Sequence, residues 1–130
     1  AGATASQGEL NYETNYRAIR YADVLLMAAE ANNRKSSAND TKAQNYLNQV
    51  RARAFGGGSN ASSSTGSVLT KEIWDERRLE LAMEGHRFFD LVRTGEAAAT
   101  IAGFVTGKHE VFPIPQTEID ISNLTQNAGY

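Results

Sequence analysis

Apolar side chains recur every three or four residues along the first part of this chain, and this period restricts the segment to helices that pack along one face. From position 16 to position 33 the pattern holds, and neither proline nor glycine interrupts it. A polar turn follows, after which Asn39 or Asp40 can cap a second helix whose apolar face extends to Ala54. The two segments together predict a helical hairpin.

The next part of the chain predicts a second hairpin. Thr70 is positioned to cap a third helix, whose apolar residues continue to Met83 before Gly85 ends it, kinks it or admits a close neighbour. A short fourth helix, from position 86 to about 94, should stop at Gly95. The predicted fold class is all-α, with tetratricopeptide-like helical hairpins followed by an irregular docked C-terminal tail.

Composition separates three further segments from these hairpins. Residues 1–15 are small and polar, as in a linker or the remnant of an upstream chain, so the predicted domain covers residues 16–130. The stretch at about 56–67 is rich in glycine and serine, and its burial would offset too little of its ordering entropy, so we expect a flexible surface loop. Residues 108–112 are expected to form a short extended piece. The tail should dock through its apolar side chains, which are Ile114, Ile119, Ile121 and Leu124.

The segment from position 73 to position 90 carries the most informative pattern, because its charges do not stay on one helical face. Arg77 lies four residues after Ile73 and four before Leu81, so its guanidinium falls within an apolar stripe and must be paired. Glu76, Glu80 and Glu84 are spaced four residues apart, so they would repel one another on an isolated helix. They therefore need cations from neighbouring elements. The pattern predicts a structural ion-pair network of Glu76, Arg77, Glu80, Glu84, Arg87 and Asp90.

A carboxylate pair that cleaves a glycosidic bond, with Glu80 and Glu84 as candidates, is the functional alternative. The many nearby arginines oppose the raised pKa that a general acid needs, so we assign no catalytic residue. His86 and His109 lack a metal-ligand partner at helical spacing, and neither a metal nor another cofactor is expected. Aromatic rings offer flat apolar faces to sugars, and the candidates for ligand binding are Tyr12, Tyr16 and Trp74. Trp74 also fits a core position.

Charge and composition exclude several other classes of function. The net charge of -2 shows no basic signature of nucleic-acid binding. There is no cysteine, which excludes a disulfide and thiolate chemistry within this chain. The longest apolar run, at 24–29, is too short to cross a bilayer, and we expect no targeting signal or anchor in this sequence.

Four stretches in this order resemble the C-terminal region of the SusD/RagB family, and together they cover most of the chain from position 16 onwards. They read YRAIRYADVLLM at 16–27 with AEA at 29–31, LNQVRARA at 47–54, ERRLELAMEGHRFFDLVR at 76–93, and FPIPQTEID at 112–120 with QNAGY at 126–130. Ala128 departs from the family pattern, which usually has proline there, and the loop at 56–67 carries no family signature.

The resemblance implies a helical, tetratricopeptide-like fold in a nutrient-binding lipoprotein of the outer membrane of Bacteroidetes. Such a protein is not an enzyme; it captures oligosaccharides or other nutrients at the extracellular face and passes them to a TonB-dependent transporter of the SusC type. The resemblance also implies that the lipidated cysteine and most ligand-contacting residues lie upstream, outside this chain. The alternative, from the helical pattern alone, is a tetratricopeptide-like scaffold that binds a protein or peptide and no sugar.

Overall fold

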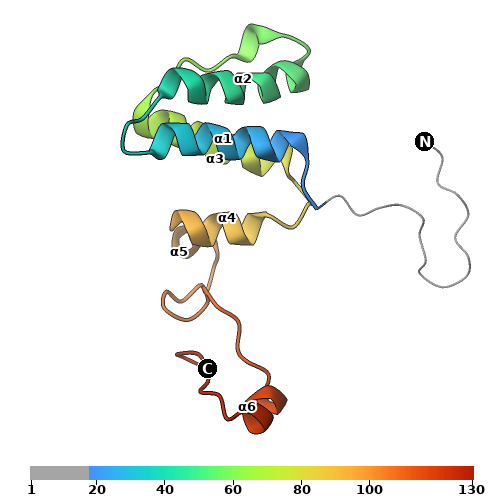
Figure 1. Ribbon diagram of the computed structural model, residues 1–130, viewed down its shortest axis with the longest axis vertical. Coiled ribbons are helices and arrows are strands. Elements are labelled where there is room, and N and C mark those ends of the chain that lie inside the picture. Colours follow the sequence, from blue (N-terminus) through green and yellow to red (C-terminus); the bar gives the residue numbers. More distant parts are fainter. Residues whose placement is uncertain (1–17) are drawn as a thin grey trace, which may run out of the picture. The chain divides into compact units, whose positions relative to one another are not determined.

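The computed structural model describes residues 18–130, and the chain divides into two compact units at the step from Glu80 to Leu81. The first unit holds the helices α1 (Tyr21–Arg34), α2 (Asp40–Phe55) and α3 (Gly66–Glu80), with a 3-10 turn, η1 (Gly58–Asn60), between the last two (Figure 1). The second unit holds α4 (Arg87–Thr94), α5 (Ala97–Thr100) and α6 (Gln116–Ser122). Every regular element within residues 18–130 is helical, so the predicted all-α class is confirmed.

The first two helices form the predicted hairpin. Asn39 caps α2, because its side-chain oxygen accepts a hydrogen bond from the backbone N–H of Lys42 at 2.9 Å. The backbone N–H of Asn39 also donates to the carbonyl of Asn32 at 2.8 Å, which closes the turn between the helices. At its other end α2 stops at Gly56, whose φ of 70° lies in the left-handed region that glycine tolerates.

A single apolar core holds the first unit together. The third helix packs against both members of the hairpin, so that all three helices contribute to this core. Its buried side chains are Leu25, Leu26, Ala29, Ala43, Leu47, Val50, Leu69 and Ile73. Ala54, which was expected on the apolar face of α2, is exposed. The pairing of the third helix with the fourth falls across the two units and stays a prediction.

The third helix begins earlier than predicted. It starts at Gly66, one turn before Thr70, so the prediction that Thr70 is the capping residue is wrong. The Asp40 carboxylate at the start of α2 accepts a hydrogen bond from the backbone N–H of Gly66 at 2.7 Å, which satisfies a free donor of the first turn. The Thr70 hydroxyl instead donates to the side chain of Asn33 at 2.5 Å, and it thereby links α3 to α1.

The third helix also ends earlier than predicted, at Glu80 rather than near Gly85. The guanidinium of Arg20 donates to the backbone carbonyl of Glu80 at 2.7 Å, and this bond satisfies a carbonyl that a longer helix would have used. Beyond it, Met83 has a φ of 68° and is fully exposed, as is most of Leu79. Neither side chain belongs to the apolar face on which the prediction placed it.

In the second unit, the short helix α4 ends at Gly95 as predicted, with a left-handed φ of 79°. Phe88 is close to two other aromatic rings, with its centroid 5.7 Å from that of Phe89 and 5.9 Å from that of Phe112. The segment at 108–112 forms turns rather than the extended piece that was expected. His109 accounts for part of this difference, because its ring nitrogen accepts a hydrogen bond from the backbone N–H of Val105 at 2.9 Å.

The tail contains a helix that the sequence reading missed. Pro115 precedes α6 and has a φ of −54°, which suits the start of a helix. Ile121 and Leu124 are exposed, so the expectation that both are buried is wrong, whereas Ile114 is half-buried. Polar bonds to the backbone hold the tail: the Gln126 amide accepts from the Ile114 N–H at 2.8 Å and donates to its carbonyl at 2.9 Å.

Candidate functional site

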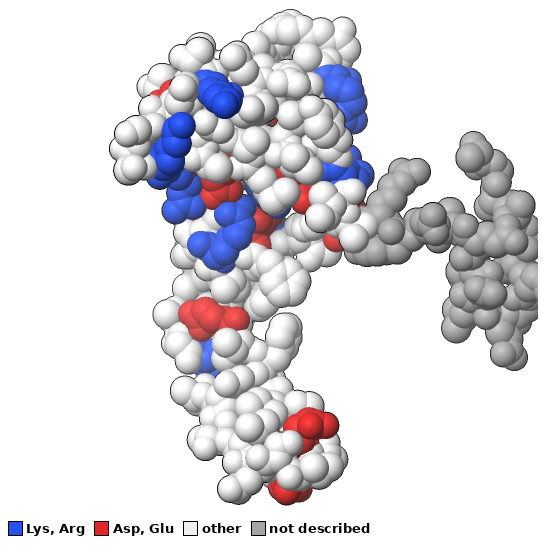
Figure 2. Space-filling view, viewed as in Figure 1, with Lys and Arg blue, Asp and Glu red and all other residues white. Residues whose placement is uncertain are grey.

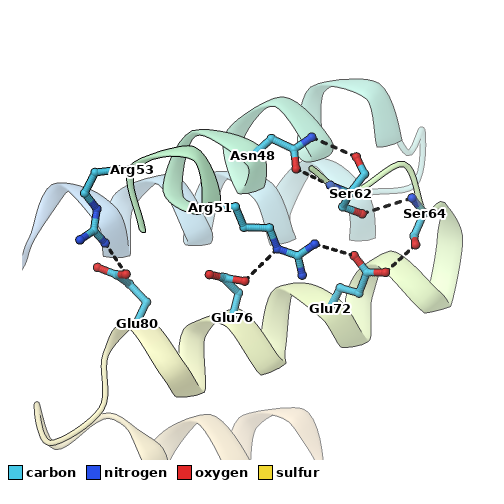
Figure 3. Close-up of polar contacts among 8 residues, drawn as sticks. All are labelled: Asn48, Arg51, Arg53, Ser62, Ser64, Glu72, Glu76 and Glu80. Carbon is cyan, nitrogen blue, oxygen red and sulfur yellow. Dashed lines mark hydrogen bonds and ion pairs between the residues drawn. The ribbon is translucent and has the colours of Figure 1, made fainter. Parts of the chain in front are cut away.

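The polar face between α2 and α3 is the most developed site of the first unit, and Arg51 lies at its centre. Its guanidinium donates to Glu76 at 2.9 Å and forms an ion pair with Glu72 at 3.3 Å (Figure 3). The two acids lie one turn apart on α3, so a single cation from α2 offsets the repulsion between them. Glu76 is buried, and burial of this carboxylate depends on the partner that Arg51 provides.

Glu80, at the end of α3, is shared by two arginines. Arg20 donates to one carboxylate oxygen at 2.9 Å. Arg53 forms an ion pair with the other oxygen, and Figure 3 shows this second contact. Because both oxygens are engaged by guanidinium groups, neither is available to protonate a glycosidic oxygen. The geometry of Glu80 therefore favours a structural role over the glycosidase alternative.

Arg77 lies inside the first unit, where the sequence pattern placed it. Its guanidinium donates to Asp23 of α1 at 2.6 Å, and each of the two residues is only 5% exposed. The partner thus comes from a helix 54 positions earlier in the sequence. A buried pair of this kind ties α3 to α1 at one register, because a shift of either helix would leave a buried charge without its partner.

Trp74 is half-buried and is held from α1. Its indole N–H donates to Glu30 at 3.0 Å, and the guanidinium of Arg34 lies 5.5 Å from the ring centroid. Arg34 also donates to Glu30 at 2.8 Å, so the three residues form one cluster. The indole N–H is thus engaged by Glu30, and Arg34 lies over the ring. A sugar-binding role for Trp74 stays a prediction.

The serine-rich segment that precedes α3 is bound to polar side chains of α2. The Asn48 amide accepts from the backbone N–H of Ser62 at 2.6 Å and donates to its carbonyl at 3.0 Å, while Gln44 donates to the carbonyl of Ser64 at 2.7 Å. Figure 3 shows the Asn48 pair and, beside it, the Ser64 hydroxyl that donates to Glu72 at 2.5 Å. We call the set of Asp40, Gln44 and Asn48 the α2 polar row. The flexibility that the sequence predicted for residues 56–67 stays a prediction.

Replacing Asn48 with alanine should release Ser62. The Ser62 amide loses its acceptor, so its hydrogen-exchange rate is expected to rise about tenfold, as one lost hydrogen bond of about 1–1.5 kcal/mol implies. Hydrogen exchange followed by NMR measures this rate. Asn45→Ala, at an exposed position of the same helix, is the matched control. An unchanged Ser62 rate in the Asn48 variant would show that the other contacts hold the segment without this amide.

Two carboxyl groups of this region are stabilised in their ionised forms. Hydrogen bonds from the Gly66 backbone and the Asn33 side chain hold the pKa of Asp40 below its ordinary value. Hydrogen bonds from Ser62 and Ser64 lower the pKa of Glu72, with a smaller contribution from Arg51 and against the opposing effect of burial. Both groups therefore hold the start of α3 most firmly when they are charged.

Acid is expected to weaken the first unit for this reason. A carboxyl whose pKa is lowered by folding contributes stability above its unfolded pKa, and this contribution is lost as pH falls through the folded pKa. The free energy of unfolding should therefore decrease as pH drops below about 4.5, the ordinary value for Glu72. Urea denaturation at pH 7 and pH 3 measures the change.

Asp40→Asn should reduce this acid sensitivity, because the variant has one fewer such carboxyl. Asp75→Asn is the matched control, since Asp75 is an exposed acid of α3. The assignment would be contradicted if the two variants and the unmodified chain lost equal stability between the two pH values.

The structure places the remaining predicted residues as follows. Tyr12 and Tyr16 lie outside the described residues. Glu84, Arg87 and Asp90 belong to the second unit, where Asp90 accepts from Arg93 at 2.8 Å and Arg87 is exposed. In residues 18–130 no group of histidine and acidic side chains is arranged to hold a metal ion, and no helix is both long and apolar enough to span a membrane.

The sequence reading missed the cations that pair with the α3 acids, as well as the α2 polar row. The three arginines concerned are Arg20, Arg51 and Arg53. The row had a visible signal, because Asp40, Gln44 and Asn48 recur every four residues and share one helical face. In Figure 2, basic and acidic side chains lie next to one another over the first unit, which is the surface expected of a paired network.

Comparison with known proteins gives the same family as the sequence motifs. The model of the SusD family matches residues 2–110. SusD-like protein P2 of Formosa agariphila is 39% identical over 99 residues, which are 72% of this chain and 19% of that protein. SusD-like protein P25 of the same organism is 32% identical over 92% of this chain and 26% of its own length. The starch-binding protein SusD of Bacteroides thetaiotaomicron is 29% identical over 91% of this chain and 22% of its own length.

This chain therefore spans about a fifth to a quarter of the length of the curated relatives that it matches. The matched part includes the whole first unit described above, with its core and its ion pairs. The residues that form these ion pairs therefore lie within the part of the chain that the family model matches.

Proposed function

Because this chain belongs to the SusD family, we propose that it is the C-terminal part of a cell-surface glycan-binding protein that works with a TonB-dependent transporter of the SusC type. The proposed activity is the capture of an oligosaccharide or another nutrient without bond cleavage. The longer protein would be held at the extracellular face of the outer membrane by a lipidated cysteine that lies upstream of this chain.

The family match is the observation that carries this proposal. The name of one relative indicates the class of ligand. That relative, from Bacteroides thetaiotaomicron, is named for starch binding. A binding role is also supported by the end of α3, where Glu80, one of the two candidate carboxylates for hydrolysis, is engaged by two arginines. Such a network positions helices, and it leaves none of these α3 carboxylates poised as an acid–base pair.

The first unit would then act chiefly as a scaffold in the longer protein. The acidic side chains of α3 form ion pairs with neighbouring cations, and every buried polar side-chain atom in the described part of the chain has a hydrogen-bond partner. A fully satisfied polar network makes a unit rigid and specifies one packing. This argues that most ligand contacts of the longer protein come from outside the α2–α3 face.

Affinity electrophoresis of the longer protein tests the proposal. Migration through gels that contain starch or other polysaccharides should be slowed by at least one of them, relative to an unrelated protein, and no new reducing ends should form. Co-purification with a SusC-type barrel tests the partnership. If the protein is slowed by no polysaccharide yet captures a peptide, the tetratricopeptide-like scaffold without sugar binding is the correct function.

A further inference from the structure

The first helix has apolar side chains on two faces, and the core of the first unit covers only one of them. Leu25, Leu26 and Ala29 belong to the core that α1 shares with α2 and α3. A second apolar set lies on the other side of α1 and is exposed or half-buried: Tyr21, Val24, Met27, Ala28 and Ala31. At about 100° per residue, these positions fall within about a third of the helix circumference. We call them the α1 outer stripe.

No member of the α1 outer stripe carries a charge at neutral pH, although Val24 is 44% exposed and Met27 is 45% exposed. The exposed positions of the other two helices of this unit are mostly polar or charged. They include Lys42, Asn45, Gln49 and Arg53 of α2, and Lys71, Asp75 and Arg78 of α3. Single exposed apolar residues are ordinary, whereas a continuous stripe on a helix that is apolar on both sides indicates a contact surface.

The length of the relatives indicates what covers the outer stripe. The matched part is only 19% of SusD-like protein P2 and 26% of SusD-like protein P25, so most of each relative lies outside it. A contact surface without charges is typical of permanent contacts, which include the packing of segments within one polypeptide. A partner that dissociates would leave the stripe open to water, and exposed apolar surfaces of this kind promote aggregation.

The shape of the stripe indicates that its partner is a helix. The stripe extends over about three turns of α1, or about 15 Å, from Tyr21 to Ala31. Tyr21, Val24 and Met27 form a ridge, and the small Ala28 and Ala31 leave room beside it for side chains of a second helix. We infer that an amphipathic helix from the upstream part of the same polypeptide packs its apolar side along the α1 outer stripe. The inference rests on the proposal that this chain is the C-terminal part of a longer protein.

Alkylation of a cysteine placed in the stripe tests this contact. This chain contains no cysteine, so Val24→Cys introduces a single thiol into it. Trypsin cuts after Arg20 and Arg34 and releases position 24 in one peptide, so mass spectrometry can follow its reaction with N-ethylmaleimide in the longer protein as well. The reaction should be about a hundredfold slower in the longer protein than in the 130-residue chain, because a covered thiol reacts only when the contact opens.

Asn45→Cys is the matched control, because Asn45 is exposed on the polar side of α2. Its thiol should react at the same rate in the two proteins. Equal rates for the Val24 variant in the two proteins would overturn the inference. A slow reaction already in the 130-residue chain would overturn it too. A rate that rises on dilution would then identify a second copy of this chain as the partner, and a rate that is independent of concentration would identify cover from within the chain.

Met27→Lys tests the same contact without a thiol, by urea denaturation followed by circular dichroism. The change should shift the urea midpoint of the 130-residue chain by less than about 0.3 M, because the position is partly exposed there. It should lower the midpoint of the longer protein by about 1 M, because the ammonium group would be buried against the upstream helix. Equal shifts in the two proteins would contradict the contact.

These outcomes are separate from those of the glycan test. If a polysaccharide slows the longer protein in gels while position 24 reacts equally fast in both proteins, the contact is removed and the proposed function stands. If position 24 is protected while no polysaccharide slows the longer protein, the contact stands and the proposed glycan binding fails.

Discussion

Replacing Arg77 with alanine is expected to lower the free energy of unfolding of the first unit by about 3–5 kcal/mol. The guanidinium is 5% exposed and donates to Asp23 at 2.6 Å, and Asp23 is equally buried. The substitution leaves that carboxylate inside the protein without its cation, and the cost of an unpaired buried charge is among the largest effects of a single change.

Urea denaturation followed by the fluorescence of Trp74 measures this loss, since Trp74 is the single tryptophan and belongs to the first unit. Arg78→Ala, at the exposed neighbouring position, should change the free energy of unfolding by less than about 0.5 kcal/mol. A double variant, Arg77→Met with Asp23→Leu, should recover much of the lost stability, because no charge is then buried. Equal stabilities of the Arg77 and Arg78 variants would show that the buried pair contributes nothing.

Replacing Leu47 with alanine should lower the free energy of unfolding by about 2–5 kcal/mol. Its side chain is fully buried in the core between the three helices, so the change removes apolar contacts and leaves a cavity that the helices fill only in part. The same fluorescence measurement applies, because the core of Leu47 also includes residues of α3.

Leu79→Ala is the control for this second change, with the same chemistry at a position that is 72% exposed. Its expected effect is within about 0.5 kcal/mol. A large loss at Leu79 would contradict the structure and favour the longer third helix that the sequence pattern predicted. Similar small losses at both positions would mean that the core does not pack around Leu47.

Local patterns in the sequence predicted the helices, because periodicity, caps and glycine stops act over a few residues. The hairpin of α1 and α2, the cap at Asn39 and the stop at Gly95 were all predictable in this way. The burial of Arg77 was also visible in the spacing of its apolar neighbours. Its partner was not, because the register between two helices depends on packing along their whole length and not on either helix alone.

The third helix and the tail show where local reasoning fails. The helix ends at Glu80, whose backbone carbonyl accepts a hydrogen bond from Arg20, sixty positions earlier, and no local signal marks this contact. The hydrogen bonds from the α2 polar row to the backbone of residues 62–66 were also not visible in the composition of this stretch. In the tail, which was expected to be irregular, α6 starts directly after Pro115, whose φ of −54° is compatible with the start of a helix.

The contact between Arg20 and Glu80 has a mechanical consequence. Arg20 immediately precedes α1 and Glu80 is the last residue of α3, so the polypeptide enters and leaves the three-helix unit at one point. Structural modules with adjacent entry and exit can be inserted into a longer chain without spreading it apart. A force applied at these two ends would therefore act across the Arg20–Glu80 contact, which joins the entry and the exit of the three-helix unit.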